Sequence, residues 1–332
     1  MNAKRQFGLG LLVTGICIAL LVRVIDWSAT ADALASANPW LIGLAVSCLL
    51  VSLTFKTARW RLLLPAGAEI TTPRLFRILH ISFFLNNVLP ARLGDVARVA
   101  LTTRQPGLRF GHVVSSLLTE RVVDGLTLLA GFVIVSPLLP LADSYRSWLH
   151  IAWAAIGGLV LMGGAIVLGQ RLALHRRAGL TLPGRFSWPR RLRDEAASFR
   201  EGWRQLFARD HVFTIWGCSW AAWLLAFAIN YLLMQALHID APITVAVLLT
   251  CTTNLAMLLP SSPGYVGVFH AAATLSLVPF NIDASPALSF AILAHLVNVV
   301  PVSLLGAVFL LANREPLALR RKPAPDPDQT VA

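Results

Sequence analysis

The sequence has few charged residues. Only 13% of its 332 residues are Asp, Glu, Lys or Arg, which is about half of the share in an average soluble domain, whereas 56% are hydrophobic and the mean hydropathy is +0.68. A chain of this composition would expose large apolar patches in water, which excludes a water-soluble globular domain. The scarcity of charge instead predicts a polytopic membrane protein built from helices.

Residues that hold metals or form disulfides are also scarce and scattered. All four cysteines lie within apolar stretches, without a CxxC motif: Cys17, Cys48, Cys218 and Cys251. Four histidines lie in or beside apolar segments, without the HxxxH or HExxH spacing of a metal site: His80, His112, His270 and His295. The sequence also lacks a P-loop and a GxSxG motif, so we expect no metal, no cofactor and no catalytic nucleophile.

Basic residues exceed acidic ones by 12, which gives a sequence pI of about 10.9. In a soluble protein this excess would indicate nucleic-acid binding. Here 25 of the 28 basic residues fall in loops expected on one side of the membrane, which is the pattern of cytoplasmic loops. We therefore predict that both termini are cytoplasmic and that nucleic acid is not a partner.

Six apolar segments are long enough to cross a bilayer as helices. They run from Phe7 to Val22 with Val24 and Ile25 added, from Trp40 to Phe55, from Val113 to Leu139, from Trp148 to Leu168, from Val212 to Leu237 and from Ala287 to Ala312. The first segment has a second interpretation as a signal peptide, because Ala31 and Ala33 resemble a cleavage site.

Basic residues are densest in two of the predicted loops. The loop after the second span is assigned to the cytoplasm by five of them: Lys56, Arg59, Arg61, Arg74 and Arg77. Residues 170–211 hold ten arginines against four acidic residues, with apolar residues at helical spacing between them. This segment is predicted to be an amphipathic helix that binds anionic lipids, or a solvated connector helix packed on the protein. The proline-rich tail, 313–332, is predicted to be disordered.

Two further apolar segments are interrupted by proline and glycine. The first runs from Leu75 to Leu89 and stops at Pro90, whereas the second runs from Ile243 to Leu259, breaks at Pro260 to Gly264 and returns from Tyr265 to Phe280. The flanking charges indicate re-entrant hairpins, the first entering from the cytoplasm and the second from outside. The predicted fold class is therefore an all-α polytopic membrane protein with six full spans and two hairpins, which hydropathy alone counts as seven or eight spans.

The two interrupted segments resemble each other. Each has an Asn, then Leu-Pro, then a Gly four residues after the Pro: Asn87, Leu89, Pro90 and Gly94 in the first half, and Asn254, Leu259, Pro260 and Gly264 in the second. If the segments enter from opposite sides, half-repeats of about 1–169 and 212–312 form an inverted repeat within one translocase domain, 1–312.

Breaks of this kind have a physical cost inside a membrane. A broken helix leaves backbone groups unpaired in hydrocarbon, so matched breaks indicate the passage of a polar group, and a structural kink sealed by neighbouring helices is the alternative. Ser262 followed by Pro263 predicts a helix N-cap, and the positive end of that helix suits a phosphate.

The third span carries three ionisable residues, Glu120, Arg121 and Asp124. Because such residues are costly in a bilayer, they face the bundle interior and pair. We expect Arg121 to pair with Asp124 one turn away, which leaves Glu120 for another partner, Arg92 or a histidine. These residues are candidates for substrate binding or proton coupling, and a static network that holds the repeats together is the alternative.

Three motifs follow one another along the chain. They are Asn-Asn-Val-Leu-Pro-Ala-Arg-Leu-Gly-Asp-Val-Ala-Arg from Asn86 to Arg98, Glu120-Arg121-x-x-Asp124, and Leu-Pro-Ser-Ser-Pro-Gly-Tyr-Val-Gly-Val-Phe from Leu259 to Phe269. Together they resemble the lysylphosphatidylglycerol synthase transmembrane region, or flippase-like, family over nearly the whole chain. The resemblance implies lipid translocation across the bacterial cytoplasmic membrane, without the soluble synthase domain. Two positions depart from it: Tyr265 replaces a further Gly, and His270 stands where relatives often have Glu.

We interpret the protein as a lipid translocase for a phospholipid or another lipid-linked polar headgroup, and not as an enzyme. The predicted substrate-binding residues are Asn87, Arg92, Arg98, Glu120, Arg121, Asp124, Asn254, Ser262 and Gly264, with the hairpin breaks at Pro90, Gly94, Pro260 and Pro263. The arginines would compensate a phosphate, the asparagines would donate hydrogen bonds, and the carboxylates would read a cationic headgroup or couple to protons. Two alternatives are open: a membrane enzyme that modifies a lipid headgroup or polyprenyl phosphate, and a non-transporting scaffold that recruits a lipid-synthesis enzyme.

Overall fold

The computed structural model describes residues 27–65, 67–89, 92–139, 209–258 and 262–312, and in these ranges the chain forms helices and no strand. Several predictions lie outside the described residues: the first and fourth spans, most of the basic loop 170–211, the tail 313–332, Pro90 and Pro260. The residues of the alternative cleavage site, Ala31 and Ala33, lie within helix α2 (Trp27–Ala35), whose Thr30 carbonyl accepts a hydrogen bond from Ser289.

Four helices of the described part are apolar and long enough to cross a bilayer. They are α3 (Pro39–Leu62), α6 (Phe110–Val135, continued by the 3₁₀ turn η2, Ser136–Leu138), α9 (Arg209–Ala236) and α12 (Ala284–Ala312). Each corresponds to one of the predicted spans. With 24 to 29 residues, these helices are about 36–44 Å long, which exceeds the hydrocarbon thickness of a bilayer.

The predicted end of the second span at Phe55 is wrong, because α3 continues for two more turns to Leu62. The helix begins at Asn38, whose side chain accepts a hydrogen bond from the Trp40 amide at 3.0 Å, and Pro39 occupies the first helical position. No proline or glycine lies between Phe55 and Pro65, so nothing in the sequence stops the helix at Phe55. Three of the basic residues assigned to the cytoplasmic loop therefore lie on the helix: Lys56, Arg59 and Arg61.

Both interrupted segments are pairs of short helices. The first pair is α4 (Thr72–Val88) and α5 (Leu93–Thr102), and the second is α10 (Ile243–Ala256) and α11 (Val268–Leu277), which is followed by the turn η4 (Val278–Phe280). A helix of ten residues is about 15 Å long, half of what a span requires. The first break follows from Pro90, since a residue before proline avoids the helical region and Leu89 is extended (φ −99°, ψ 144°).

The second break differs from its prediction in one respect. Ser262 and Pro263 do begin a helical turn, η3 (Pro263–Tyr265), but it has only three residues and the Ser262 side chain does not cap it. The next helix, α11, starts at Val268 after Gly267, which has a φ of 84°. The predicted long helix with its N-terminus at Ser262 is therefore wrong, because the backbone turns into the left-handed region at Gly264 (φ 69°).

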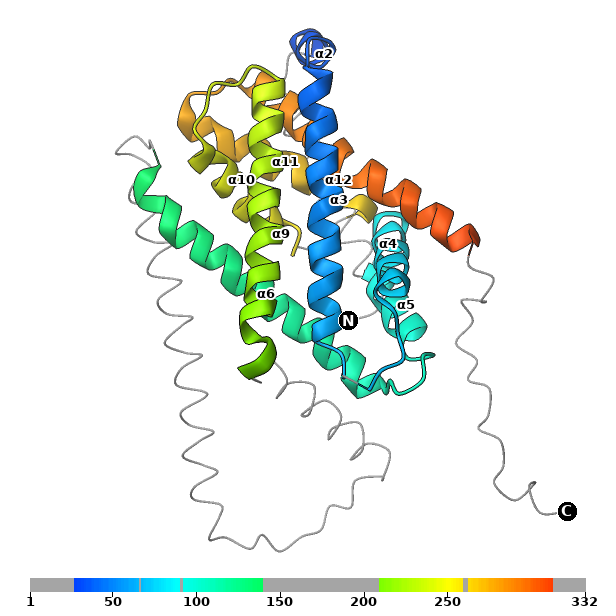
Figure 1. Cartoon of the computed structure of the whole chain (residues 1–332). Helices are drawn as coiled ribbons and strands as arrows, with labels where there is room; N and C mark the ends of the chain where they lie inside the picture. The colour runs from blue at the N-terminus through cyan, green and yellow to red at the C-terminus, as the bar shows by residue number, and fades with distance from the viewer. Residues whose placement is uncertain (1–26, 66, 90–91, 140–208, 259–261, 313–332) are drawn as a thin grey trace, which may run out of the picture.

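Helices α3 and α9 lie side by side and run in opposite directions along the molecule, while α6 and α12 cross them obliquely (Figure 1). The pair α4 and α5 packs together and α4 contacts α12, whereas α10 and α11 pack on α9 and α12. Close contact of α12 with α4 depends on Gly306, where a Cβ atom would collide with the carbonyl of His80 and with Phe84. Both interrupted segments thus pack on α12, the first through α4 and the second through α11.

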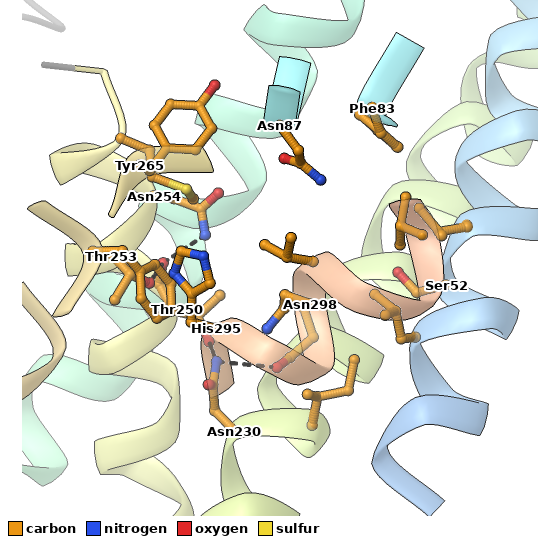
Figure 2. A pocket seen from close by; sticks show the side chains of 18 of the residues that line it. Ser52, Phe83, Asn87, Asn230, Thr250, Thr253, Asn254, Tyr265, His295 and Asn298 are labelled. Atoms are coloured by element: carbon orange, nitrogen blue, oxygen red, sulfur yellow. Dashed lines mark hydrogen bonds between the residues drawn. The ribbon is translucent and has the colours of Figure 1, made fainter. Parts of the chain in front are cut away.

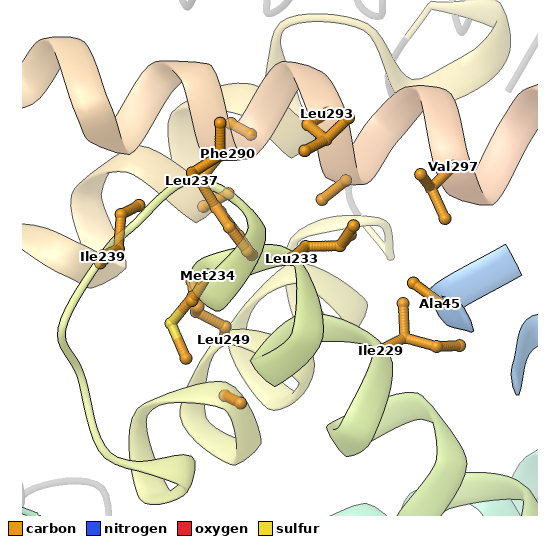
Figure 3. Packing of buried hydrophobic residues seen from close by; sticks show 14 of the residues in the cluster. Ala45, Ile229, Leu233, Met234, Leu237, Ile239, Leu249, Phe290, Leu293 and Val297 are labelled. Carbon is orange, nitrogen blue, oxygen red and sulfur yellow. The ribbon is translucent and has the colours of Figure 1, made fainter. Parts of the chain in front are cut away.

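The largest apolar cluster joins α3, α9, α10, α11 and α12. Figure 3 shows Ala45 of α3, Ile229 and Leu233 of α9, Leu249 of α10 and Val297 of α12 meeting in this cluster. A second cluster surrounds Trp60 and joins α3 to α4, α5 and α6. Lipid tails are as apolar as these side chains, so close packing rather than exclusion from water stabilises both clusters.

Candidate functional site

A cavity of ≈ 230 Å³ lies where both interrupted segments meet α3, α9 and α12. Apolar residues make part of its wall, and the polar part consists of amides, hydroxyls, one imidazole, one indole and the amine of Lys56; Figure 2 labels ten of the lining residues. The polar and aromatic lining residues are Ser52, Lys56, Phe83, Asn87, Trp223, Asn230, Thr250, Thr253, Asn254, Tyr265, Phe269, His295 and Asn298. A polar cavity among helices of membrane-spanning length is the kind of site that handles a polar substrate.

Helical spacing explains why these residues share one space. In each lining helix they recur every three or four positions, so they form one stripe on one face. The stripes are Leu49, Ser52, Leu53 and Lys56 in α3, Trp223, Ala226, Ile229 and Asn230 in α9, Thr250, Thr253, Asn254 and Met257 in α10, and His295, Asn298, Val299 and Val302 in α12. The proline in α12, Pro301, adds a free backbone carbonyl at Val297 beside this face.

The two interrupted segments touch at the cavity. A Cβ atom on Gly264 would lie 3.4 Å from the carbonyl oxygen of Asn87, so the two turns approach to van der Waals distance. The Asn87 side chain donates a hydrogen bond to the Ser303 hydroxyl at 2.9 Å, which ties the end of α4 to α12. Figure 2 shows Asn87 facing Asn254 and Tyr265 across the open space.

Arg92 bridges the two breaks. It has a left-handed backbone (φ 54°), and its guanidinium donates a hydrogen bond to the carbonyl of Met257 at 2.8 Å. That carbonyl is at the C-terminus of α10, where helix carbonyls have no partner within the helix. The same guanidinium lies 5.7 Å from the centre of the Tyr265 ring. Arg92 therefore supplies a hydrogen bond that the broken backbone of the second segment lacks.

Tyr265, which departs from the family pattern, has a φ of 58°. A left-handed backbone is unstrained for glycine and costs a tyrosine about 1–2 kcal/mol. This explains why a glycine is expected at the position. In this chain the strained residue places an aromatic ring on the cavity wall and next to the Arg92 guanidinium.

The ionisable residues of the third span form pairs other than those predicted from the sequence. Glu120 accepts two hydrogen bonds from Arg98, at 2.7 and 3.2 Å, and the Arg98 guanidinium lies 3.7 Å from the Trp60 ring centre. The expected pair of Arg121 with Asp124 is wrong. Asp124 instead accepts a hydrogen bond from Arg59 at 2.6 Å, since the seven extra residues of α3 place Arg59 within the bundle.

Further contacts complete these two pairs. Asp124 also accepts a hydrogen bond from the Trp223 indole at 2.9 Å, and Arg59 donates to Ser219 at 2.9 Å. The side chains of Arg59 and Arg98 are 0% and 1% exposed, so both pairs are shielded from solvent. Arg121, by contrast, is 47% exposed and lies 3.5 Å from Asp95 in a loose pair.

The structure divides the predicted site residues into three groups. Those on the cavity wall are Asn87, Asn254 and Gly264. Arg92 joins the breaks beside the cavity, Ser262 and Pro263 form the η3 turn, and Gly94 packs against the Ser82 carbonyl of α4. The four charged residues Arg98, Glu120, Arg121 and Asp124 do not line the cavity. Their predicted roles in substrate binding stay predictions.

Sequence analysis missed Ser52, Lys56, Asn230, Thr250 and Thr253 as cavity residues. The signal that could have found them is a stripe of polar residues at helical spacing within an otherwise apolar segment. Lys56 was hidden by its assignment to a loop. The two histidines near the cavity also form an unforeseen contact, since His270 stacks on His295 at 4.8 Å between ring centres.

The helices and the cavity define a multi-pass helical membrane protein with a polar cavity among its helices. The chain belongs to the lysylphosphatidylglycerol synthase TM region family, whose model matches residues 8–306. It is 29% identical over 327 residues to the glycosyltransferase AglD of Haloferax volcanii, an alignment that covers 87% of this chain and 51% of AglD. A UPF0104 membrane protein of Methanothermobacter thermautotrophicus is 23% identical over 330 residues, 92% of both chains. The chain thus spans about half the length of AglD.

Proposed function

We propose that this protein translocates a lipid, and that the cavity between the two interrupted segments holds the polar headgroup while the acyl chains stay in the membrane. The observation that carries the proposal is the meeting of both breaks at one polar cavity. A headgroup that leaves water loses hydrogen bonds, and each loss costs several kcal/mol. Hydrogen bonds to the amide and hydroxyl groups of the cavity wall can offset this cost.

The relatives support a role in the handling of lipid headgroups or lipid-linked glycans. The family is named after a synthase of a modified phospholipid, and AglD is named a glycosyltransferase. The basic loops support cytoplasmic termini, and the proposal includes a location in the bacterial inner membrane. An enzyme that modifies a lipid receives less support, because the described residues that line the cavity include no carboxylate, and an acid and a base would have to come from His295, Lys56 and Tyr265.

The proposal is tested by filling the cavity. Ala226 lies on the cavity wall, so Ala226→Phe places a ring in the space that the headgroup would occupy. The control is Leu224→Phe on the same helix, whose side chain is 56% exposed on the outer surface. Both variants and the wild type are reconstituted in liposomes that contain lipids with a fluorescent acyl chain, and dithionite quenching of the outer leaflet reports exchange between leaflets.

We expect exchange with the wild type and with Leu224→Phe, and at least a tenfold slower exchange with Ala226→Phe. Equal rates for the two variants, both folded, would show that lipids do not use this cavity. Product formation from a lipid by the purified protein in detergent would favour the enzyme instead, since detergent micelles have no second compartment.

A further inference from the structure

Lys56 is the one charged residue among the described residues that line the cavity. It lies six residues before the end of α3, about 9 Å along the helix axis. A lysine so near a helix end usually extends toward the membrane surface, where water solvates its charge. Here the side chain lies across the bundle instead, because its Nζ atom is 4.6 Å from the centre of the Trp223 ring on α9.

No carboxylate of the described residues forms an ion pair with Lys56. The nearest acidic residues belong to other cations, since Asp124 accepts hydrogen bonds from Arg59 and Trp223. Glu120 is held by both terminal nitrogens of Arg98. Each of these pairs is neutral as a whole, so Lys56 contributes to the cavity wall an amine that lies in the field of Asp124 but has no ion-pair partner of its own among the described residues.

The remaining polar wall is neutral and rich in groups that pair with hydroxyls. Asn87, Asn230, Asn254 and Asn298 contribute amides, and Thr250 and Thr253 contribute hydroxyls. Such groups donate and accept hydrogen bonds but do not balance the charge of an amine. A cationic headgroup in this cavity would therefore face Lys56 without a counter-ion, which is unfavourable in a low dielectric.

We infer that the cavity selects a lipid whose headgroup has a net negative charge, with a phosphate bound by Lys56 and hydroxyl groups bound by the surrounding amides, and that it disfavours aminoacylated, cationic headgroups. This inference rests on the proposed function, because it names the substrate class of the same site. It assigns the recognition of phosphate to Lys56, in place of the arginines that the sequence suggested.

The test compares two lipids that differ in headgroup charge. Phosphatidylglycerol is anionic and carries two hydroxyls, whereas lysylphosphatidylglycerol is cationic, and both are used with a fluorescent acyl chain in the dithionite assay. The wild type is expected to exchange phosphatidylglycerol at least about tenfold faster, which corresponds to the loss of one charge-assisted hydrogen bond. If the ligand is a lipid-bound phosphate, soluble glycerol phosphate in tenfold excess should leave the exchange rate unchanged. Inhibition of exchange by glycerol phosphate would show that the cavity binds a soluble phosphate instead.

Substitutions of Lys56 then separate recognition from structure. Lys56→Met should slow phosphatidylglycerol about tenfold and leave lysylphosphatidylglycerol within twofold, whereas Lys56→Arg should retain the wild-type preference. Lys56→Glu should reverse the preference, which a purely structural role of Lys56 would not do. The matched control is Arg77→Met, which removes an exposed cation of α4 outside the cavity.

The outcomes distinguish the two proposals. If the wild type exchanges neither lipid nor a neutral or zwitterionic one, the proposed function fails. If the wild type exchanges lipids but prefers the cationic one, or if folded Lys56→Met and Lys56→Glu keep the wild-type preference, the selection by Lys56 is overturned and the translocase proposal stands.

Discussion

The charged residues around α6 and the polar residues around the cavity differ in how fully they are paired. Around α6, Arg98 with Glu120 and Arg59 with Asp124 form closed pairs at 2.7 and 2.6 Å, and all four side chains are at most 13% exposed. Around the cavity, the asparagines and threonines bond to their own helix or to one neighbouring helix: Asn230 donates to Ala226 and to Thr250, and Asn254 and Asn298 each donate to the carbonyl four residues earlier. Their amides keep further donors and acceptors for a ligand.

This difference separates the paired charges of the protein from the neutral polar groups of its cavity. In each buried pair the two opposite charges compensate each other, although Nε and Nη2 of Arg59 and Nε of Arg98 have no hydrogen-bond partner among the described residues. Removal of one member of a pair leaves an unpaired charge. Neutral polar groups on the wall of a cavity cost less free energy to bury than charged groups do, and the water molecules bound to them can be replaced by a headgroup. The pairs around α6 therefore connect it to α3 and α5, whereas the polar groups of the cavity wall are neutral apart from Lys56.

The largest effect is expected from Glu120→Ala. The substitution leaves Arg98, 1% exposed, as an unpaired charge between α5 and α6, so the free energy of unfolding should fall by about 3–5 kcal/mol. The measurement is reversible unfolding in mixed micelles with increasing SDS. A folded Glu120→Ala protein with unchanged stability and no lipid exchange would break the comparison, because it would give Glu120 the coupling role that the sequence suggests.

A double substitution sharpens this result. Arg98→Met with Glu120→Leu removes both charges and keeps apolar volume beside the Trp60 ring. We expect it to recover most of the stability lost in Glu120→Ala. If the double variant also exchanges lipids at the wild-type rate, the pair is structural.

Much of the fold was predictable because hydrophobic length is a strong signal. Four of the predicted spans recur in the described residues, because a span needs an apolar run of about 20 residues, which is easy to see in a sequence. Both breaks recur too, because proline and glycine interrupt a helix locally. The motif residues Asn87, Asn254 and Gly264 also reach the cavity, as their matched positions in the two segments suggested.

The pairing of charges was not predictable, because it depends on contacts between distant helices. Arg59 and Asp124 are 65 residues apart, and their pair forms only because α3 extends past Phe55. Lys56 was misplaced for the same reason. The positive-inside rule counts basic residues near a helix end and does not tell whether the last turns of the helix carry them.

The second largest effect is expected at the contact of α4 with α12, which positions Asn87 on the cavity wall. A methyl group on Gly306 collides with the backbone of His80, so Gly306→Ala should lower the free energy of unfolding by about 1–3 kcal/mol. Gly43→Ala in α3 is the control, because no atom lies within 4 Å of its added Cβ and alanine favours the helix. Equal stability of both variants in the SDS titration would contradict the close packing of these helices.

A smaller effect is expected from the exposed pair of Arg121 with Asp95. Arg121→Met should change the free energy of unfolding by about 0–1 kcal/mol, because the pair is 3.5 Å apart and its side chains are 47% and 28% exposed. This places Arg121 between the two regions: it belongs to α6 but lacks the closed pairing of its neighbours. A loss of lipid exchange in stable Arg121→Met protein would move the functional region from the cavity toward α6.

The smallest effect on stability, with a clear effect on exchange, is expected from Asn298→Ala in the cavity wall. Its amide donates only to the Ala294 carbonyl of its own helix at 2.8 Å, so the free energy of unfolding should change by less than about 0.5 kcal/mol. The lost hydrogen bond to a headgroup should slow exchange about three- to tenfold. Leu296→Ala, two residues away and 49% exposed, is the control that should not slow it. A destabilised Asn298→Ala protein with normal exchange would contradict this prediction. It would show that the polar residues of the cavity wall stabilise the fold and that the headgroup does not pass through the cavity.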